Sequence, residues 1–144
     1  MLDNCRNIYK TARETAGLTQ EKASELLFIS VRSIADYESG RTIPGDDVVC
    51  RMIENYKSKI LAYMHLKYSS DVGYKYLPDI ISNDFSTSVI RFQKEYQDIS
   101  TVHKDMIEVA CDGMVDDNEV HKWEKVKKEI SEMAGAAMAL MFAK

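Results

Sequence analysis

The sequence contains few helix-breaking residues and no long apolar run. Only 2 prolines and 6 glycines occur among 144 residues, which excludes a collagen-like chain and leaves room for long helices. The longest apolar stretch, residues 133–143, is much shorter than the roughly 20 residues that a membrane-spanning helix needs. The first residues are polar, so we expect no signal peptide and no membrane partner.

Residues that commonly build disulfides, metal sites or active sites are sparse. The 3 cysteines (Cys5, Cys50, Cys111) are odd in number and far apart, so neither a disulfide framework nor a zinc site has support. The 3 histidines are scattered, and no phosphate-binding loop, nucleophile elbow or zinc-protease motif occurs. We therefore expect a cytoplasmic protein with free thiols that is not an enzyme and has no cofactor or metal.

Acidic residues exceed basic ones, but not evenly along the chain. The chain has 19 basic and 23 acidic side chains, a net charge of −4. Residues 1–66 are neutral, and residues 67–144 carry the whole acidic excess. An acidic total is therefore no argument against nucleic-acid binding by the first part. It does mean that attraction to phosphates would depend on a few well-placed basic side chains.

Apolar residues recur at steps of three and four through nearly all of the chain, which is typical of helices with one buried face. No alternating apolar and polar run is long enough for a strand, so we predict an all-α protein. Turn-forming residues divide it into a helical domain at 1–68, a linker at 69–84 and a second helical region at 85–144.

Two short predicted helices in the first part have the spacing of a helix-turn-helix. They cover residues 19–27 and 30–38, and Thr19 and Ser30 stand at the positions of helix caps. Residues 46–68 follow a Pro-Gly turn signal and show helical spacing to their end without a clear break. In a helix-turn-helix the second helix enters the DNA major groove by its N-terminal end.

The residues of this motif resemble those of the Xre/Cro-type (phage-repressor) helix-turn-helix family. The resemblance is carried by LTQEKASELL at 18–27, ISVRSI at 29–34 and YESGR at 37–41, followed by Pro44. It covers about residues 4–66. It implies a five-helix lambda-repressor-like DNA-binding domain, which a C-terminal helical hairpin would follow here.

The resemblance also implies a DNA-contacting set and a structural ion pair. Phosphate contacts would come from the recognition-helix start and its flanks, and base contacts from the exposed side of that helix. The implied DNA-binding residues are Gln20, Ser30, Val31, Arg32, Ser33, Asp36 and Arg41. Arg13 and Glu38 would form a buried ion pair between the first and third helices. Ser30 as a plain helix cap, and Arg32 as an ordinary solvated side chain, remain open alternatives.

One position departs from the family pattern. The turn residue that is commonly glycine in the family is Phe28 here. A positive φ at a bulky aromatic residue would be strained. We therefore expect the turn to be re-angled and Phe28 to pack against the surface or against the second part.

The second part is predicted to be a pair of helices at about 85–111 and 117–142. The later helix has apolar residues in strict steps of three and four: Trp123, Val126, Ile130, Met133, Ala137 and Leu140. Such a seam can pack against a second copy of the chain in a dimeric coiled coil, or against the preceding helix in an intramolecular hairpin. Both contacts can exist in the same protein. The acidic segment 108–119 has some calcium-loop spacing but too few oxygen ligands, so we read it as a connector.

These features together predict a sequence-specific DNA-binding transcription regulator. The resemblance suggests a repressor in a bacterial or prophage setting that binds an inverted-repeat operator in double-stranded DNA as a homodimer. An alternative is a protein-interaction module, antagonist-like or antitoxin-like, that uses the same fold and the C-terminal helices to bind a second regulator protein.

Overall fold

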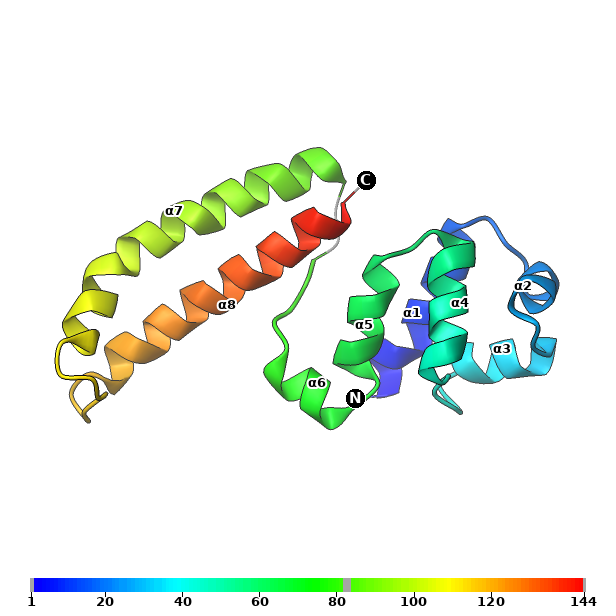
Figure 1. The fold of residues 1–144 in the computed structure, drawn as a ribbon, viewed down its shortest axis with the longest axis horizontal. Helices are drawn as coiled ribbons and strands as arrows, with labels where there is room; N and C mark the ends of the chain where they lie inside the picture. Colours follow the sequence, from blue (N-terminus) through cyan, green and yellow to red (C-terminus); the bar gives the residue numbers. More distant parts are fainter. Residues whose placement is uncertain (1, 82–83, 144) are drawn as a thin grey trace. The chain divides into compact units, whose positions relative to one another are not determined.

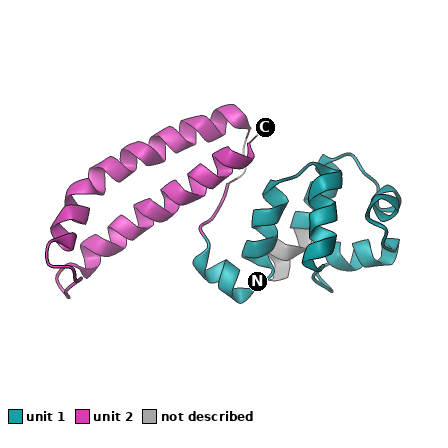
Figure 2. Cartoon of the chain, in the orientation of Figure 1, with its two compact units in different colours: residues 1–77 teal, residues 78–144 magenta. Residues whose placement is uncertain are grey.

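The computed structural model describes residues 2–81 and 84–143, with side chains from Ile8 onward. This part of the chain folds into eight helices and contains no strand, which confirms the predicted all-α class. The chain divides into two compact units, residues 1–77 and residues 78–144 (Figures 1 and 2). None of the described helices has both the length and the apolar character needed to cross a bilayer.

The first unit holds six helices. These are α1 (Leu2–Thr15), α2 (Gln20–Leu27), α3 (Val31–Glu38), α4 (Asp46–Tyr56), α5 (Ile60–Tyr68) and α6 (Asp71–Tyr76). The starts of α2 and α3 are fixed locally. The Thr19 hydroxyl accepts the Lys22 N–H at 3.1 Å, and the Ser30 hydroxyl accepts the Ser33 N–H at 3.0 Å. Each cap satisfies a backbone donor that the helix cannot pair internally.

One apolar core joins helices α1 to α5. Its buried residues are Tyr9, Ala12, Ala23, Leu27, Ile34, Val48, Val49, Met52, Tyr56 and Leu61. The helical spacing of residues 46–68 had shown no break, but Lys57 adopts a left-handed conformation with φ of 55° and ends α4. This break separates α4 from α5, and both helices pack on α1. The α2–α3 pair is held by α1, which contacts α3, and by α4, which contacts α2.

A short helix lies within the segment that was expected to be a linker. Helix α6 packs on α5 so closely that a Cβ atom on Gly73 would lie 2.0 Å from the Leu66 carbonyl oxygen. The buried Lys67 side chain donates to the Leu77 carbonyl at 2.5 Å, which ties the end of this segment to α5. Only glycine permits so close an approach of two backbones.

The second unit is an antiparallel helical hairpin of α7 (Phe85–Ala110) and α8 (Val120–Phe142) (Figure 1). The Asp84 carboxylate caps α7 by accepting the N–H and the hydroxyl of Thr87, and these bonds lower the pKa of Asp84. The buried residues of α7 lie seven apart, at Ser88, Glu95, Val102 and Val109. Residues seven apart share one helix face, so this stripe faces α8.

The acidic connector between α7 and α8 uses its carboxylates to close its own turns. Asp112 accepts the Met114 N–H at 3.0 Å, and Asp116 accepts the N–H groups of Asn118 and Glu119 at 2.8 and 3.0 Å. Such bonds are typical of Asx turns. They give Asp112 and Asp116 a structural role in the connector.

Candidate nucleic-acid interface

The α2–turn–α3 segment is held in place by hydrogen bonds at both ends of the turn. The Ser24 hydroxyl donates to the Ile29 carbonyl at 2.7 Å, across the turn. From α4, Arg51 donates to the Leu27 carbonyl at 3.1 Å and pairs with Asp47 at 3.2 Å. Arg51 thereby satisfies a carbonyl that the end of α2 leaves unpaired. Sequence reasoning missed this role, and the only sequence signal for it is the four-residue spacing of Asp47 and Arg51.

Phe28 keeps the left-handed conformation that the family pattern requires at this turn. Its φ and ψ are 55° and 42°, and its N–H donates to the Ser24 carbonyl. The next N–H, of Ile29, reaches the same carbonyl at 3.3 Å. These bonds close α2 only if the intervening residue is left-handed. The expectation of a re-angled turn with a packed Phe28 is therefore wrong, and the ring is 88% exposed.

A buried polar network joins α1, α2 and α3. Arg13 donates to both carboxylate oxygens of Glu38, at 2.6 and 3.0 Å, and to the Leu18 carbonyl at 2.6 Å. The hydrogen bond with Glu38 raises the pKa of Arg13. Gln20 at the start of α2 adds a third hydrogen bond to the same carboxylate, at 2.9 Å. Its amide has a second N–H, which leaves one donor for a phosphate.

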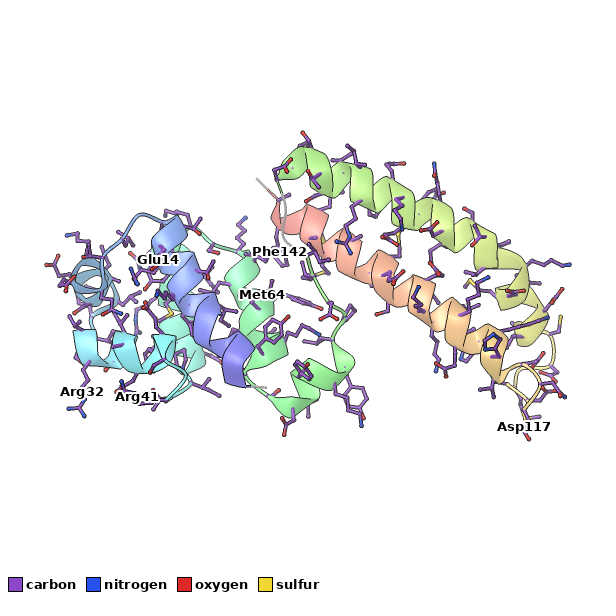
Figure 3. All side chains as sticks on the ribbon, turned by 180° about the vertical axis from the view of Figure 1, so that it is seen from behind. Glu14, Arg32, Arg41, Met64, Asp117 and Phe142 are labelled. Atoms are coloured by element: carbon purple, nitrogen blue, oxygen red, sulfur yellow. The ribbon has the colours of Figure 1, made fainter. Side chains whose placement is uncertain are left out.

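The N-terminal end of α3 is exposed and lacks acidic residues. Ser30, Val31 and Arg32 are exposed, and Ser33 is half-buried. The first turn of α3 contains no acidic side chain, so its positive dipole end is not neutralised from within the helix. Figure 3 shows Arg32 extending away from the body of the unit.

Arg32 differs from the other arginines whose side chains the structure describes. Arg13, Arg41, Arg51 and Arg91 each pair with an acidic residue. Arg32 alone among them has no hydrogen-bond or ion-pair partner within the described residues. A free guanidinium at the start of an exposed helix is available to an external acceptor, such as a base edge or a phosphate.

Asp36 and Arg41 are engaged with each other. The Arg41 Nη1 atom lies 3.0 Å from Asp36 Oδ1, an ion pair without a well-aligned hydrogen bond. The Arg41 backbone N–H also donates to the Asp36 carbonyl at 2.9 Å. The family resemblance implied a base contact for Asp36 and a phosphate contact for Arg41. Their pairing compensates the negative charge that Asp36 would otherwise bring to the interface.

The apolar seam of α8 divides between two environments. Val126 is fully buried, whereas Ile130 is 39% exposed. By seven-residue spacing, Met133 and Leu140 lie on the Val126 side, while Trp123 and Ala137 lie on the Ile130 side. Val126 therefore lies inside the hairpin and Ile130 is partly open to solvent, while Trp123, Met133, Ala137 and Leu140 are half-buried.

Residues 10–61 match the family model described as helix-turn-helix. No curated protein and no solved structure compared with the chain gives a match. The matched residues run from α1 into α5 and include the α2–α3 pair, the Arg13–Glu38 network and Arg32. The resemblance stated from the sequence is thus confirmed: residues 10–61 match the Xre/Cro-type helix-turn-helix family, which is a DNA-binding regulatory family.

Proposed function

We propose that this protein is a sequence-specific transcription repressor that binds an inverted-repeat operator as a homodimer. The observation that carries the proposal is the unpartnered Arg32 guanidinium at the exposed start of α3. Every other described arginine is already paired within the protein. A helix-turn-helix domain with one free arginine at this position is suited to read a base in the major groove.

The roles of the other contacts follow from their positions on α3. Arg32 donates two hydrogen bonds to guanine, and the Val31 side chain covers a thymine methyl group. Ser30, Ser33 and the free N–H groups of the first turn of α3 bind a phosphate. Gln20 uses its remaining amide hydrogen on a second phosphate, while its bond to Glu38 fixes its direction.

Asp36 and Arg41 act as a pair that opens on DNA. When Arg41 turns toward a phosphate, the Asp36 carboxylate is released and accepts a hydrogen bond from a cytosine amino group. The Arg41 side chain is 66% exposed, so this rotation needs no change in the core. The exchange of partners limits binding to sequences that satisfy both groups.

The C-terminal hairpin supplies the dimer contact in this proposal. Large apolar side chains remain exposed on it, including Phe85 at 55%, Tyr96 at 58% and Ile107 at 56%. By helical spacing Phe85 and Tyr96 lie on one flank of the α7 stripe that faces α8, and Ile130 lies beside the buried Val126 of α8. A second hairpin that covers this flank would bury it in a four-helix bundle. Two domains would then read half-sites about 34 Å apart or a multiple of this.

The test is fluorescence anisotropy with sequences selected from random DNA and with the DNA upstream of the protein's own gene. Arg32→Ala is expected to weaken specific binding by about 5- to 150-fold, the equivalent of one lost bidentate base contact. Lys104→Ala is the matched control, because it removes one positive charge from an 86% exposed side chain on α7. Equal affinities of the two variants would refute the role of Arg32.

A protein-interaction function is the second candidate. In this alternative the helix-turn-helix fold and the hairpin bind another regulator, as antagonists and antitoxins do. The 88% exposed Phe28 ring beside α3 favours it, since an exposed aromatic side chain suits a protein partner better than a phosphate backbone. Absence of DNA binding at low salt and micromolar protein would reject the repressor and leave this alternative.

A further inference from the structure

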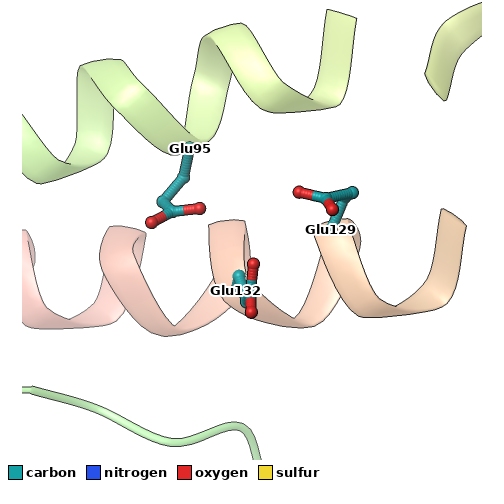
Figure 4. Close-up of side chains that lie close together, drawn as sticks. All are labelled: Glu95, Glu129 and Glu132. Atoms are coloured by element: carbon teal, nitrogen blue, oxygen red, sulfur yellow. The ribbon is translucent and has the colours of Figure 1, made fainter. Parts of the chain in front are cut away.

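Three glutamate side chains converge inside the C-terminal hairpin. Glu95 comes from α7, and Glu129 and Glu132 come from α8 (Figure 4). One carboxylate oxygen of each lies within 4.8 Å of those of the other two. Their side chains are 6%, 13% and 40% exposed, respectively. Three negative charges so close together, with one almost fully buried, repel one another unless a positive charge lies among them.

Glu95 is the decisive member of this glutamate cluster. Its Oε1 atom has two basic neighbours at the edge of the hairpin, Lys94 at 3.3 Å and Arg91 at 4.0 Å. Its Oε2 atom is buried and has no hydrogen-bond partner within the described residues. Buried carboxylate oxygens are normally satisfied by a donor or a cation. The carboxylate points toward α8, where the other two glutamates lie (Figure 4).

We propose that Glu95, Glu129 and Glu132 bind a divalent cation that prefers oxygen ligands, and that Ca²⁺ fits best. Two ligands on opposite sides of Ca²⁺ are about 4.6–5.2 Å apart, twice the usual calcium–oxygen distance. The oxygen atoms of the cluster lie within 4.8 Å of one another, so they fall within this limit and one ion can contact all three. The smaller Mg²⁺ needs an almost ideal octahedron and gives up its waters reluctantly, whereas Ca²⁺ accepts irregular sets of carboxylates.

Space for the remaining ligands adjoins the cluster. A cavity of about 350 Å³ is lined by Asp79, Arg91, Lys128, Ser131 and Glu132. It shares Glu132 with the cluster and opens to solvent. Water molecules in this cavity can complete the six to eight oxygen ligands that Ca²⁺ takes.

The basic side chains near the cluster compete with the cation but do not replace it. Lys128 Nζ lies 3.4 Å from Glu132 and 3.9 Å from Glu129, and Lys94 pairs with Glu95 and Asp98. No basic side chain among the described residues pairs with all three glutamates. Lys128 and Lys94 are 66% and 64% exposed, so their ends can turn into solvent when an ion enters. A bound ion would clamp the middle of α7 to α8, independently of whether the first unit binds DNA.

Calorimetric titration of the full chain, freed of metals with a chelator, tests the site. Separate titrations use CaCl₂, MgCl₂ and MnCl₂ at constant ionic strength, and one Ca²⁺ per chain is expected. Glu95→Gln should abolish saturable binding, and Glu132→Gln should weaken it at least tenfold. Glu124→Gln is the control, since it removes a 61% exposed carboxylate from the same helix outside the cluster. Lys128→Ala should strengthen binding because it removes a competing cation.

Thermal unfolding gives a second measurement that does not depend on heats of binding. Without metal, Glu95→Gln should melt at or above the wild-type temperature, because the substitution removes a buried negative charge that Glu129 and Glu132 repel. With Ca²⁺ the order should reverse, since only the wild type gains stability by binding. Absence of saturable binding for all three cations would overturn the proposal. So would equal stabilisation of the wild type and Glu95→Gln, which would indicate general screening.

Discussion

Phe28 offers the sharpest test of how the helix-turn-helix turn is built. The residue is left-handed, with φ of 55°, and its ring is 88% exposed. A non-glycine residue in this conformation costs about 1–2 kcal/mol. Phe28→Gly removes that strain and sacrifices almost no buried apolar area. Glycine in turn loses about 0.5–1 kcal/mol more backbone entropy on folding. The net expectation is a gain of about 0.5–1 kcal/mol in the free energy of unfolding.

Equilibrium unfolding in urea, followed by helical circular dichroism, measures this gain. For a unit of this size it corresponds to a rise of about 2–8 °C in the thermal midpoint. Phe28→Ala is the matched control, because alanine removes the ring but keeps the left-handed strain. If the glycine variant is no more stable than the alanine variant, backbone strain at Phe28 does not limit stability and the reasoning fails. The same pair of variants shows whether the exposed ring takes part in binding DNA or a partner.

Three further predictions concern the first unit. Glu38→Ala should destabilise it by about 3–5 kcal/mol, because it leaves the buried Arg13 without its Glu38 partner. Urea unfolding of this variant and of the double variant Arg13→Met/Glu38→Leu checks the prediction, and the double variant should lose less stability. Asp36→Ala should strengthen non-specific DNA binding several-fold in low salt, because it frees Arg41 from its ion pair at 3.0 Å; unchanged affinity and salt slope would contradict this. Burial, followed by the charge of Glu38, raises the pKa of Tyr56 from 10.0 to about 12. Because the raised pKa favours the protonated phenol in the folded state, this contribution to stability is complete below pH 10 and is lost between about pH 10 and 12. In an alkaline titration followed by tyrosinate absorbance at 295 nm, the component that titrates at the highest pH should therefore be absent from Tyr56→Phe. An unaltered curve would refute the assignment.

The helix-turn-helix motif was predictable because its signals are local. Thr19 and Ser30 begin α2 and α3 through caps that span three residues, and the apolar spacing selects the buried faces. Ala23, Leu27 and Ile34 lie in the core where this spacing places them. Such signals survive in sequence because a cap or a helical face needs only near neighbours.

Features that join distant residues were harder to predict. The docking of α6 depends on Gly73 meeting the backbone of α5, and the segment alone has the composition of a linker. The turn at Phe28 keeps φ positive because two hydrogen bonds outweigh the strain of a bulky residue. Propensity alone favours the opposite outcome at both positions, and tertiary contacts override it.

The charges of the chain can likewise be divided into what composition determines and what only the fold decides. Composition alone established that residues 1–66 are neutral and that the acidic excess lies in the second part. It could not show that Asp36 and Arg41 neutralise each other or that Arg32 stays free, because both depend on how α3 and the residues after it fold together. Nor could it show that Glu95 meets Glu129 and Glu132. Local patterns set the helices and their buried faces, whereas pairing between side chains needs the three-dimensional distances that folding alone creates.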